Sequence, residues 1–187
     1  MNHDIIVQPT PNPNAFKFIT HIDVISEGKH TFNSIEECSN ELLVPMVRAL
    51  FMLGSITNIH LFENVITVTK TDDHPWAIME EAIKATVLQH IESHNPNFIT
   101  TVSEKPVQKK QKSPELQAID AILDKSIRPS LQMDGGDLTL ISLKDGVLKL
   151  NYEGACGSCP SAQMGTLQAI QNIIHSEYDE NIIVETI

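Results

Sequence analysis

The chain has 187 residues, 41% hydrophobic and 20% charged, which is ordinary for a globular protein and long enough for two small domains. Its 24 acidic and 13 basic residues give a formal net charge of −11, so nucleic acid is not an expected partner, because phosphates need a basic face. No apolar run could span a bilayer and the start at Met1 lacks a basic leader, so we expect no membrane partner and a cytoplasmic location.

The first hundred residues predict a small domain of strands and helices. Strands are expected at 5–7 and 15–19, separated by a proline-rich turn, because each proline biases the residue before it away from helix. Pro45 can begin a helix that stops at Gly54. Residues 56–61 and 65–69 predict a hairpin.

A longer helix is predicted from Pro75 to the Asn95-Pro96-Asn97 stop. Its core-facing residues recur at helical spacing and are Trp76, Met79, Ile83, Val87 and Ile91. The same segment carries His90 and His94, four residues apart. That spacing suits two ligands of one metal, but histidine is also favoured at the last turn of a helix by the helix dipole.

Residues 103–113 predict a flexible linker, because they are rich in lysine and contain almost no apolar side chain that could order them. The linker separates a predicted N-terminal domain, residues 1–102, from a predicted C-terminal domain, residues 114–187. Each length lies within the usual range for an independent domain.

The C-terminal domain is predicted to have the order α-β-β-α-β. Ser113 and Pro114 begin a helix, whose buried face is Leu116, Ile119, Leu123 and Ile127, and Arg128-Pro129 lies at its end. Strands at 138–143 and 147–152 form a hairpin around Asp145-Gly146. A helix from Ser161, buried through Leu167, Ile170 and Ile174, and a strand at 182–187 complete an α+β domain.

Two polar features of this domain are open to more than one interpretation. Asp134-Gly135-Gly136-Asp137 is interpreted as a turn that needs positive φ at glycine, with cation or phosphate binding as the alternative. Arg128 is interpreted as a cation at a helix C-terminus, a surface residue or a contact between two chains, and the sequence does not decide among these.

The strongest chemical signal is a C-x-x-C motif formed by Cys156 and Cys159, two of the three cysteines. The motif follows a predicted strand and precedes a predicted helix. Backbone N–H groups and the helix dipole there favour the thiolate, which both binds metals and attacks disulfides. Gly154 and Gly157 let the backbone approach whatever the sulfurs hold. The motif alone therefore leaves metal binding and redox chemistry open.

Two thiolates do not complete a metal site, because structural zinc and the common iron–sulfur clusters take four ligands. The third cysteine, Cys38, lies in the other predicted domain and is expected to be a small buried hydrophobe. The simplest completion is a second copy of the chain, which brings its own pair to the first about a two-fold axis. Such a site on short loops suits a carrier that releases its cluster.

Two other hypotheses use the same pair. In a thiol–disulfide oxidoreductase, Cys156 and Cys159 would form a redox couple, although the hairpin before the loop differs from the βαβ setting of a thioredoxin-like motif. In a zinc-bridged module, the same thiolates would be colourless structural ligands between two chains.

Several motifs, taken in order, resemble the NifU C-terminal-like domain of Nfu proteins. They are Arg128-Pro129, Asp134-Gly135-Gly136-Asp137, the hairpin, Gly154-x-Cys156-x-x-Cys159-Pro160-Ser161 and Thr166-Leu167. The first half resembles the Nfu N-terminal domain through 9–18, 49–51, 66–70 and Trp76. The combination covers nearly the whole chain and is specific, whereas C-x-x-C alone is weak. Gln163-Met164-Gly165 departs from the apolar stretch expected there and concerns helix packing only.

The resemblance implies an iron–sulfur cluster scaffold and carrier, not an enzyme, that binds a [4Fe–4S] cluster between two chains and transfers it to apo-proteins. It places the ligands on Cys156 and Cys159 and leaves a [2Fe–2S] form open. The implied partners are apo iron–sulfur proteins, an upstream scaffold or A-type carrier, and a second copy of the chain when the cluster is bound. Relatives with both domains include mitochondrial proteins, so the expected location is a bacterial cytoplasm, or the mitochondrial matrix for a mature eukaryotic form.

Overall fold

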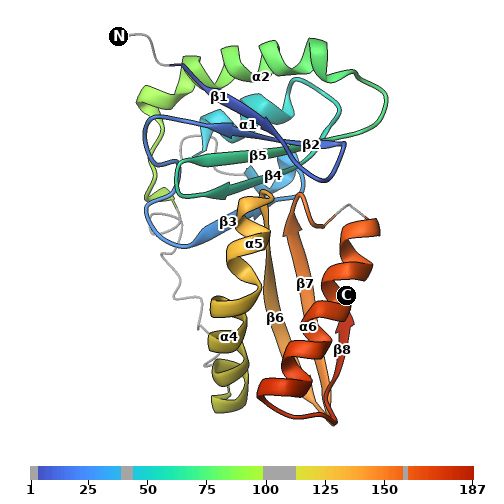
Figure 1. Ribbon diagram of the computed structural model, residues 1–187. Helices are drawn as coiled ribbons and strands as arrows, with labels where there is room; N and C mark the ends of the chain where they lie inside the picture. Colours follow the sequence, from blue (N-terminus) through green and yellow to red (C-terminus); the bar gives the residue numbers. More distant parts are fainter. Residues whose placement is uncertain (1–3, 39–43, 99–112, 158–159) are drawn as a thin grey trace. The chain divides into compact units, whose positions relative to one another are not determined.

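The computed structural model describes residues 4–38, 44–98, 113–157 and 160–187. The chain divides into two compact units, Met1–Lys105 and Pro106–Ile187, each with its own sheet and apolar core. Both units combine helices with a sheet, which confirms the predicted α+β class (Figure 1). The predicted linker, apart from Ser113, lies outside the described residues. No helix in the described ranges is both long enough and apolar enough to cross a membrane.

The N-terminal unit is an antiparallel sheet with strand order β1-β2-β5-β4-β3. The strands are β1 (Ile6–Pro9), β2 (Ala15–Ile19), β3 (Lys29–Phe32), β4 (Ile56–Phe62) and β5 (Val65–Lys70). The helices are α1 (Pro45–Phe51) and α2 (Trp76–His90), with 3₁₀ turns at Ile35–Cys38 and Ile91–Ser93. The predicted hairpin is β4–β5, and its turn holds Glu63 at a φ of 50°.

The core of this unit joins one face of the sheet to α1 and α2. Alternate residues of the central strands point into it, among them Ile59, Leu61, Ile66 and Val68, because side chains of a strand alternate between its two faces. The predicted stripe of α2 is confirmed, since Met79, Ile83 and Val87 are all buried. Full burial of each such side chain contributes about 1.5–3 kcal/mol to stability.

Trp76 fastens the start of α2 to the sheet. Its ring stacks on Phe16, with ring centres 4.1 Å apart and planes 9° apart, and its Nε1–H donates to the Pro13 carbonyl at 2.8 Å. The Nζ of Lys70 lies 5.2 Å from the ring centre as a cation–π contact. The sequence resemblance at Trp76 and at residues 9–18 therefore falls on two segments that pack on each other.

The described residues of the C-terminal unit form a three-stranded sheet in the order β6-β7-β8 and three helices (Figure 1). The strands are β6 (Gly136–Lys144), β7 (Val147–Gly154) and β8 (Ile183–Thr186). The helices are α4 (Pro114–Ser126), α5 (Arg128–Met133) and α6 (Pro160–Glu177). β6 and β7 pair antiparallel, whereas β7 and β8 pair parallel, so α6 is the crossover helix of a β7–α6–β8 unit.

Local chemistry sets two of the boundaries in this unit as predicted. The Ser113 hydroxyl accepts a hydrogen bond from the Leu116 N–H at 3.3 Å and so caps α4. Asp145 and Gly146 both have positive φ, 51° and 75°, which is the type I′ geometry of a two-residue hairpin turn.

Between α4 and β6, one predicted feature is confirmed and one boundary is wrong. Arg128-Pro129 follows directly on the end of α4, as predicted, and it also begins a second helix, α5, because a proline in the first helical turn loses no hydrogen bond. Asp134 and Gly135 form the turn, with Gly135 at a φ of 80°, but Gly136 and Asp137 already pair with β7 as part of β6.

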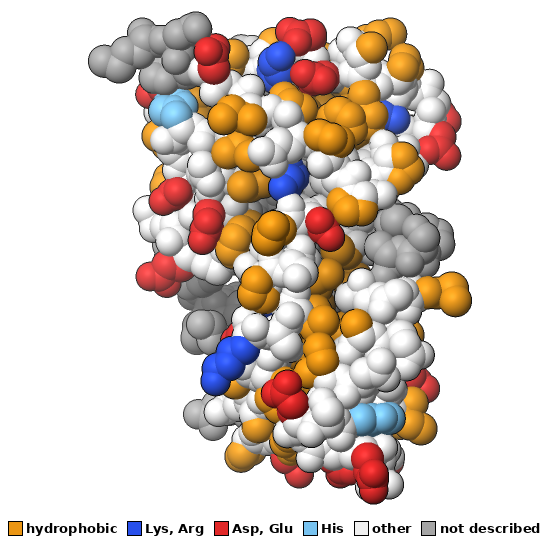
Figure 2. Space-filling model, viewed as in Figure 1, with side chains coloured by type: hydrophobic (Ala, Val, Ile, Leu, Met, Phe, Trp, Pro, Cys, Tyr) orange, Lys and Arg blue, Asp and Glu red, His pale blue; other side chains and the backbone are white. Residues whose placement is uncertain are grey.

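The surface reflects the acidic composition. On the face shown in Figure 2, acidic side chains are scattered and basic ones are few.

Candidate functional site

Cys156 lies on the loop between β7 and α6. The loop turns at Gly154, which has a φ of 61°, and closes with a hydrogen bond of 3.1 Å from the Gly157 N–H to the Gly154 carbonyl. Cys159 lies outside the described residues. The first cysteine therefore sits where strand leads to helix, as predicted.

That placement also corrects an argument made from the sequence. The loop joins the first strand and the helix of β7–α6–β8, whose two strands are parallel. Its setting is a βαβ unit, so the expectation that the setting differs from that of a thioredoxin-like motif is wrong. The thiol–disulfide hypothesis gains from this correction.

Gly136 makes room for the sulfur of Cys156. A Cβ at position 136 would lie 2.5 Å from the Cys156 Sγ, 2.8 Å from the Glu153 carbonyl oxygen and 2.9 Å from the Cys156 nitrogen. Side-chain atoms are not found at such distances, so only glycine lets the loop pack this closely. The Ala155 N–H also donates to the Gly135 carbonyl at 3.1 Å. Gly135 and Gly136 thus form the wall against which the cysteine loop rests.

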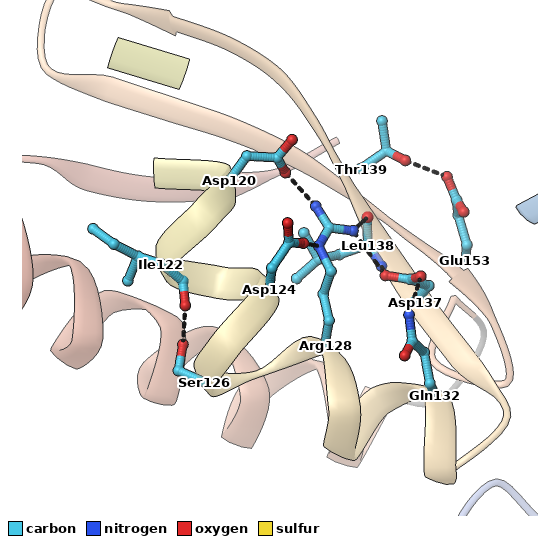
Figure 3. A network of polar contacts seen from close by, with 10 residues as sticks. All are labelled: Asp120, Ile122, Asp124, Ser126, Arg128, Gln132, Asp137, Leu138, Thr139 and Glu153. Atoms are coloured by element: carbon cyan, nitrogen blue, oxygen red, sulfur yellow. Dashed lines mark hydrogen bonds and ion pairs between the residues drawn. The ribbon is translucent and has the colours of Figure 1, made fainter. Parts of the chain in front are cut away.

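Arg128 lies among the side chains of Asp120, Asp124 and Asp137 (Figure 3). Its Nη1 donates to the Asp137 Oδ1 at 2.9 Å and to the Leu138 carbonyl at 2.6 Å, and its Nη2 donates to Asp120. Its Nε lies 2.6 Å from the Asp124 Oδ1 as an ion pair without hydrogen-bond geometry. The structure therefore decides the open question about Arg128: its side chain is only 12% exposed and is enclosed by three carboxylates.

Asp137 is the most buried of these carboxylates, at 2% exposure. Besides Arg128, it accepts from the Leu138 N–H at 2.6 Å and from the Gln132 Nε2 at 3.2 Å. Burial opposes the charge on Arg128, but the carboxylates of Asp137, Asp120 and Asp124 together raise the pKa of Arg128, so it stays a cation. The network fixes Asp137, the residue next to Gly136, and so fixes the wall behind Cys156.

Reasoning from the sequence missed Asp120 and Asp124. Together with Arg128 they have the i, i+4, i+8 spacing that places side chains on one helix face, and this spacing was the available signal. Their convergence on Asp137 required knowledge of the tertiary structure.

Tyr152 is a second residue that the sequence did not single out. It lies on β7, its side chain belongs to the same core as Cys156, and it is 6% exposed. Its hydroxyl is buried and has no hydrogen-bond partner among the described residues. Burial raises the pKa of Tyr152 far above its usual value, and negative charge on Cys156 raises it further, so the hydroxyl stays protonated.

Cys38 belongs to the core of the N-terminal unit, at the end of the Ile35–Cys38 turn. Its side chain is fully buried, as expected of a small hydrophobe. Burial raises the pKa of its thiol to about 11, Glu37 adds to the shift, and Arg48 opposes it. A thiol of this kind is a poor nucleophile and a poor metal ligand at neutral pH.

The expected pair of histidines on one helix does not form. α2 ends at His90, and His94 follows a 3₁₀ turn in extended backbone. The buried ring of His94 donates from Nε2 to the Val24 carbonyl at 2.7 Å, and burial lowers its pKa. In the described ranges, no three His, Cys, Asp or Glu side chains converge to hold a metal. His94 therefore has a structural role.

Comparison with known proteins adds independent findings. Residues 5–94 match the family model described as scaffold protein Nfu/NifU N terminal, and residues 119–185 match the NifU-like domain. A Drosophila willistoni protein named NFU1 iron-sulfur cluster scaffold homolog, mitochondrial, is 28% identical over 98% of this chain and 63% of its own length. An Arabidopsis thaliana NifU-like protein 5, mitochondrial, is 29% identical over 91% of this chain and 62% of its own.

Solved structures show a weaker likeness. The solution structure of a NifU-like protein from Saccharomyces cerevisiae covers 49% of this chain and 80% of its own, at 14% identity and a TM-score of 0.43. The chain spans less than two thirds of the length of the two relatives named above.

Proposed function

Because the chain belongs to the Nfu family, with an Nfu N-terminal domain followed by a NifU-like domain, we propose that it is an iron–sulfur cluster scaffold. It would hold a [4Fe–4S] cluster through Cys156 and Cys159 and pass it to apo-proteins, without acting as an enzyme. One observation carries the proposal: the Cys156 sulfur packs against Gly136, in the space that a side chain there would need, on a loop between a strand and a helix. Relatives named as cluster scaffolds support the same function.

The number of ligands leads to a dimer. One chain offers two thiolates in the C-x-x-C motif, and a [4Fe–4S] cluster takes four. Two copies related by a two-fold axis supply four thiolates, so no ligand other than cysteine is needed. Dimerisation is then coupled to loading, because the cluster itself is the link between the chains.

Transfer follows from the same chemistry. Thiolate ligands exchange one for one: a recipient thiolate bonds to iron as the Cys156 or Cys159 thiolate leaves, and no electron changes hands. In this exchange the Arg128 network does no proton chemistry. It keeps Gly136 in place, so that the loop can accept the next cluster without refolding.

The division into domains adds a second part to the proposal. The N-terminal domain, joined through the lysine-rich segment 103–112, would bind a donor or recipient and raise the local concentration of the cluster site. The relatives are named mitochondrial proteins, and a cytoplasmic location of this chain stays a prediction.

Anaerobic reconstitution with ferrous iron and sulfide tests the cluster proposal. We expect a brown dimer with four irons per two chains and broad absorption near about 400 nm, as thiolate-ligated clusters show. Cys156→Ser and Cys159→Ser should each lose the bound iron while keeping the folded circular dichroism spectrum. Cys38→Ala is the matched control and should load normally. Iron and sulfide retained by a Cys156→Ser/Cys159→Ser double variant would refute the proposal.

The βαβ setting of the loop favours a second candidate, a thiol–disulfide oxidoreductase. It predicts a colourless monomer that reduces insulin and loses this activity in Cys156→Ser. The 6% exposure of Cys156 does not separate the two candidates, because attack on a substrate disulfide and a cluster shared between two chains both need an accessible sulfur. Insulin reduction by the unloaded protein decides between the two candidates.

A further inference from the structure

The two most exposed large apolar side chains among the described residues flank the cysteine loop. Met164 is 79% exposed and lies in the second turn of α6, the helix that follows the loop. Met133 is 75% exposed and ends α5, two residues before Gly135, whose carbonyl accepts from the Ala155 N–H of the loop. One exposed apolar residue needs no explanation, but two beside a candidate site indicate a surface for contact with another molecule.

Gly165, next to Met164, leaves space that its own unit does not use. A Cβ there would meet no described atom within 4 Å, and its φ is not positive. Glycine inside a helix is less favourable than alanine, because it loses more backbone freedom on folding. Packing and backbone geometry within the unit therefore do not explain Gly165. The departure of residues 163–165 from an apolar stretch was expected to concern helix packing, but Met164 and Gly165 are both exposed.

The same region carries no formal charge. No Asp, Glu, Lys or Arg occurs between Glu153 and Glu177, which is the longest such stretch of a chain with a net charge of −11. The stretch contains the cysteine loop and all of α6 up to its last residue. Gly165 and Gln168, exposed positions beside Met164 on α6, belong to it.

The lack of charge favours a second copy of the chain over an unlike partner. About a two-fold axis, each residue near the axis faces its own copy, so a charge there would meet a like charge and be repelled. An unlike partner can supply the opposite charge, so its contact surface does not have to be neutral. An acidic chain that binds itself needs an uncharged surface at the axis.

We propose that the exposed face of α6 at Met164, Gly165 and Gln168 is the contact between two copies, with Met164 of each copy over Gly165 of the other. A two-fold axis produces such reciprocal contacts, and the flexible side chain of methionine fills irregular space in them. Met133 lies at the rim, since Asp134 beside it is charged and exposed. The surface is small, so the unloaded dimer is weak, and the cluster stabilises it; this last part rests on the proposed function.

Met164→Glu places two carboxylates near the axis, and Met52→Glu, at a methionine of the N-terminal unit that is 70% exposed, is the matched control. In reconstituted protein, sedimentation velocity over a dilution series should show the Met164→Glu dimer dissociating at about tenfold higher concentration than the wild type, because one repulsive pair has been added. Met52→Glu should match the wild type. A Met164→Glu dimer as stable as the wild type would overturn the inference.

Gly165→Ala should have effects of opposite sign on the chain and on the dimer. The urea midpoint of the unloaded chain should rise, because the unfolded state loses freedom and open space surrounds the new methyl group. The loaded dimer should dissociate at about threefold higher concentration, because the methyl group occupies the space proposed for Met164. A dimer that Gly165→Ala strengthens or leaves unchanged would contradict the proposed contact.

Cross-linking of the unloaded chain keeps the test separate from the proposed function. In a Cys156→Ser/Cys159→Ser background, Met164→Cys places a thiol at the contact, and Met52→Cys is the control. Diamide oxidises two such thiols to a disulfide and is itself reduced, and electrophoresis without reductant measures the dimer. Met164→Cys should cross-link about tenfold faster than Met52→Cys, because the contact raises the local thiol concentration.

The outcomes separate the two proposals. Equal cross-linking rates for Met164→Cys and Met52→Cys would refute the contact, even if the wild type loads iron. Faster cross-linking of Met164→Cys, together with a wild type that loads no iron, would support the contact and refute the cluster proposal alone.

Discussion

Cys38 and Cys156 are both buried cysteines, but their surroundings differ in kind. Cys38 is enclosed by the apolar core of the N-terminal unit, and this burial raises the pKa of its thiol and favours the neutral form. Cys156 sits on a loop between two backbone segments, with a glycine on one side and a tyrosine hydroxyl in the same core. Burial alone does not make a cysteine structural, because what matters is whether the neighbours can accommodate an anionic sulfur.

The largest expected effect on this comparison comes from Arg128→Met. It leaves Asp137 as a buried carboxylate without its cation, which typically destabilises a protein by about 3–5 kcal/mol. Urea unfolding followed through the tyrosines should show this loss in the C-terminal unit. Lys84→Met, which breaks an exposed ion pair with Glu81 in the N-terminal unit, is the control; its unfolding, followed through Trp76, should hardly change. Equal losses would show that the Arg128 network does not support the wall.

Gly136→Ala tests the packing of the Cys156 sulfur directly. The new methyl group meets the Cys156 sulfur and two backbone atoms, so we expect a loss of about 1–3 kcal/mol and a displaced loop. Displacement should make alkylation of Cys156 faster while Cys38 stays unreactive. Gly165→Ala on α6 has open space around it and should instead stabilise the unit by up to about 1 kcal/mol. A neutral Gly136→Ala would contradict the close packing described above.

The smallest effect concerns the titration of Cys38. Its pKa is about 11 in the folded chain against an ordinary value of 9.0, so above pH 9 the unfolded chain ionises first. Stability from the neutral thiol is complete below pH 9 and falls as pH rises to 11. Cys38→Ala should lack this fall, so the difference in unfolding free energy between wild type and variant should shrink by about 2 kcal/mol or less across that range. A constant difference would mean that Cys38 is more solvated than its burial indicates.

Local sequence chemistry predicted the parts of the fold that depend on neighbours along the chain. The type I′ turn at Asp145-Gly146 and the Ser113 cap each need only two to four consecutive residues. The end of α2 was missed because His94 turns inward to the Val24 carbonyl, 70 positions earlier in the sequence. Arg128-Pro129 was correctly placed after the first helix, but the short helix α5 that it begins was missed.

The candidate site divides in the same way. Cys156 was found from its motif, since spacing and glycines are visible in the sequence. Gly136 and Asp137 gained their roles only through the pairing of β6 with β7, where a shift of one residue would turn each to the opposite face. The correction of the βαβ setting has the same origin, because nothing local shows that β8 pairs parallel to β7.

The fixed ring of Trp76 has an optical consequence. The chain contains one tryptophan, packed on Phe16 in the N-terminal unit, whereas both tyrosines, Tyr152 and Tyr178, are in the C-terminal unit. Indole emission therefore reports the melting of one unit and phenol absorbance that of the other. One sample can therefore record two separate unfolding transitions. A shift in the transition seen by one signal but not by the other identifies which unit a ligand or partner binds.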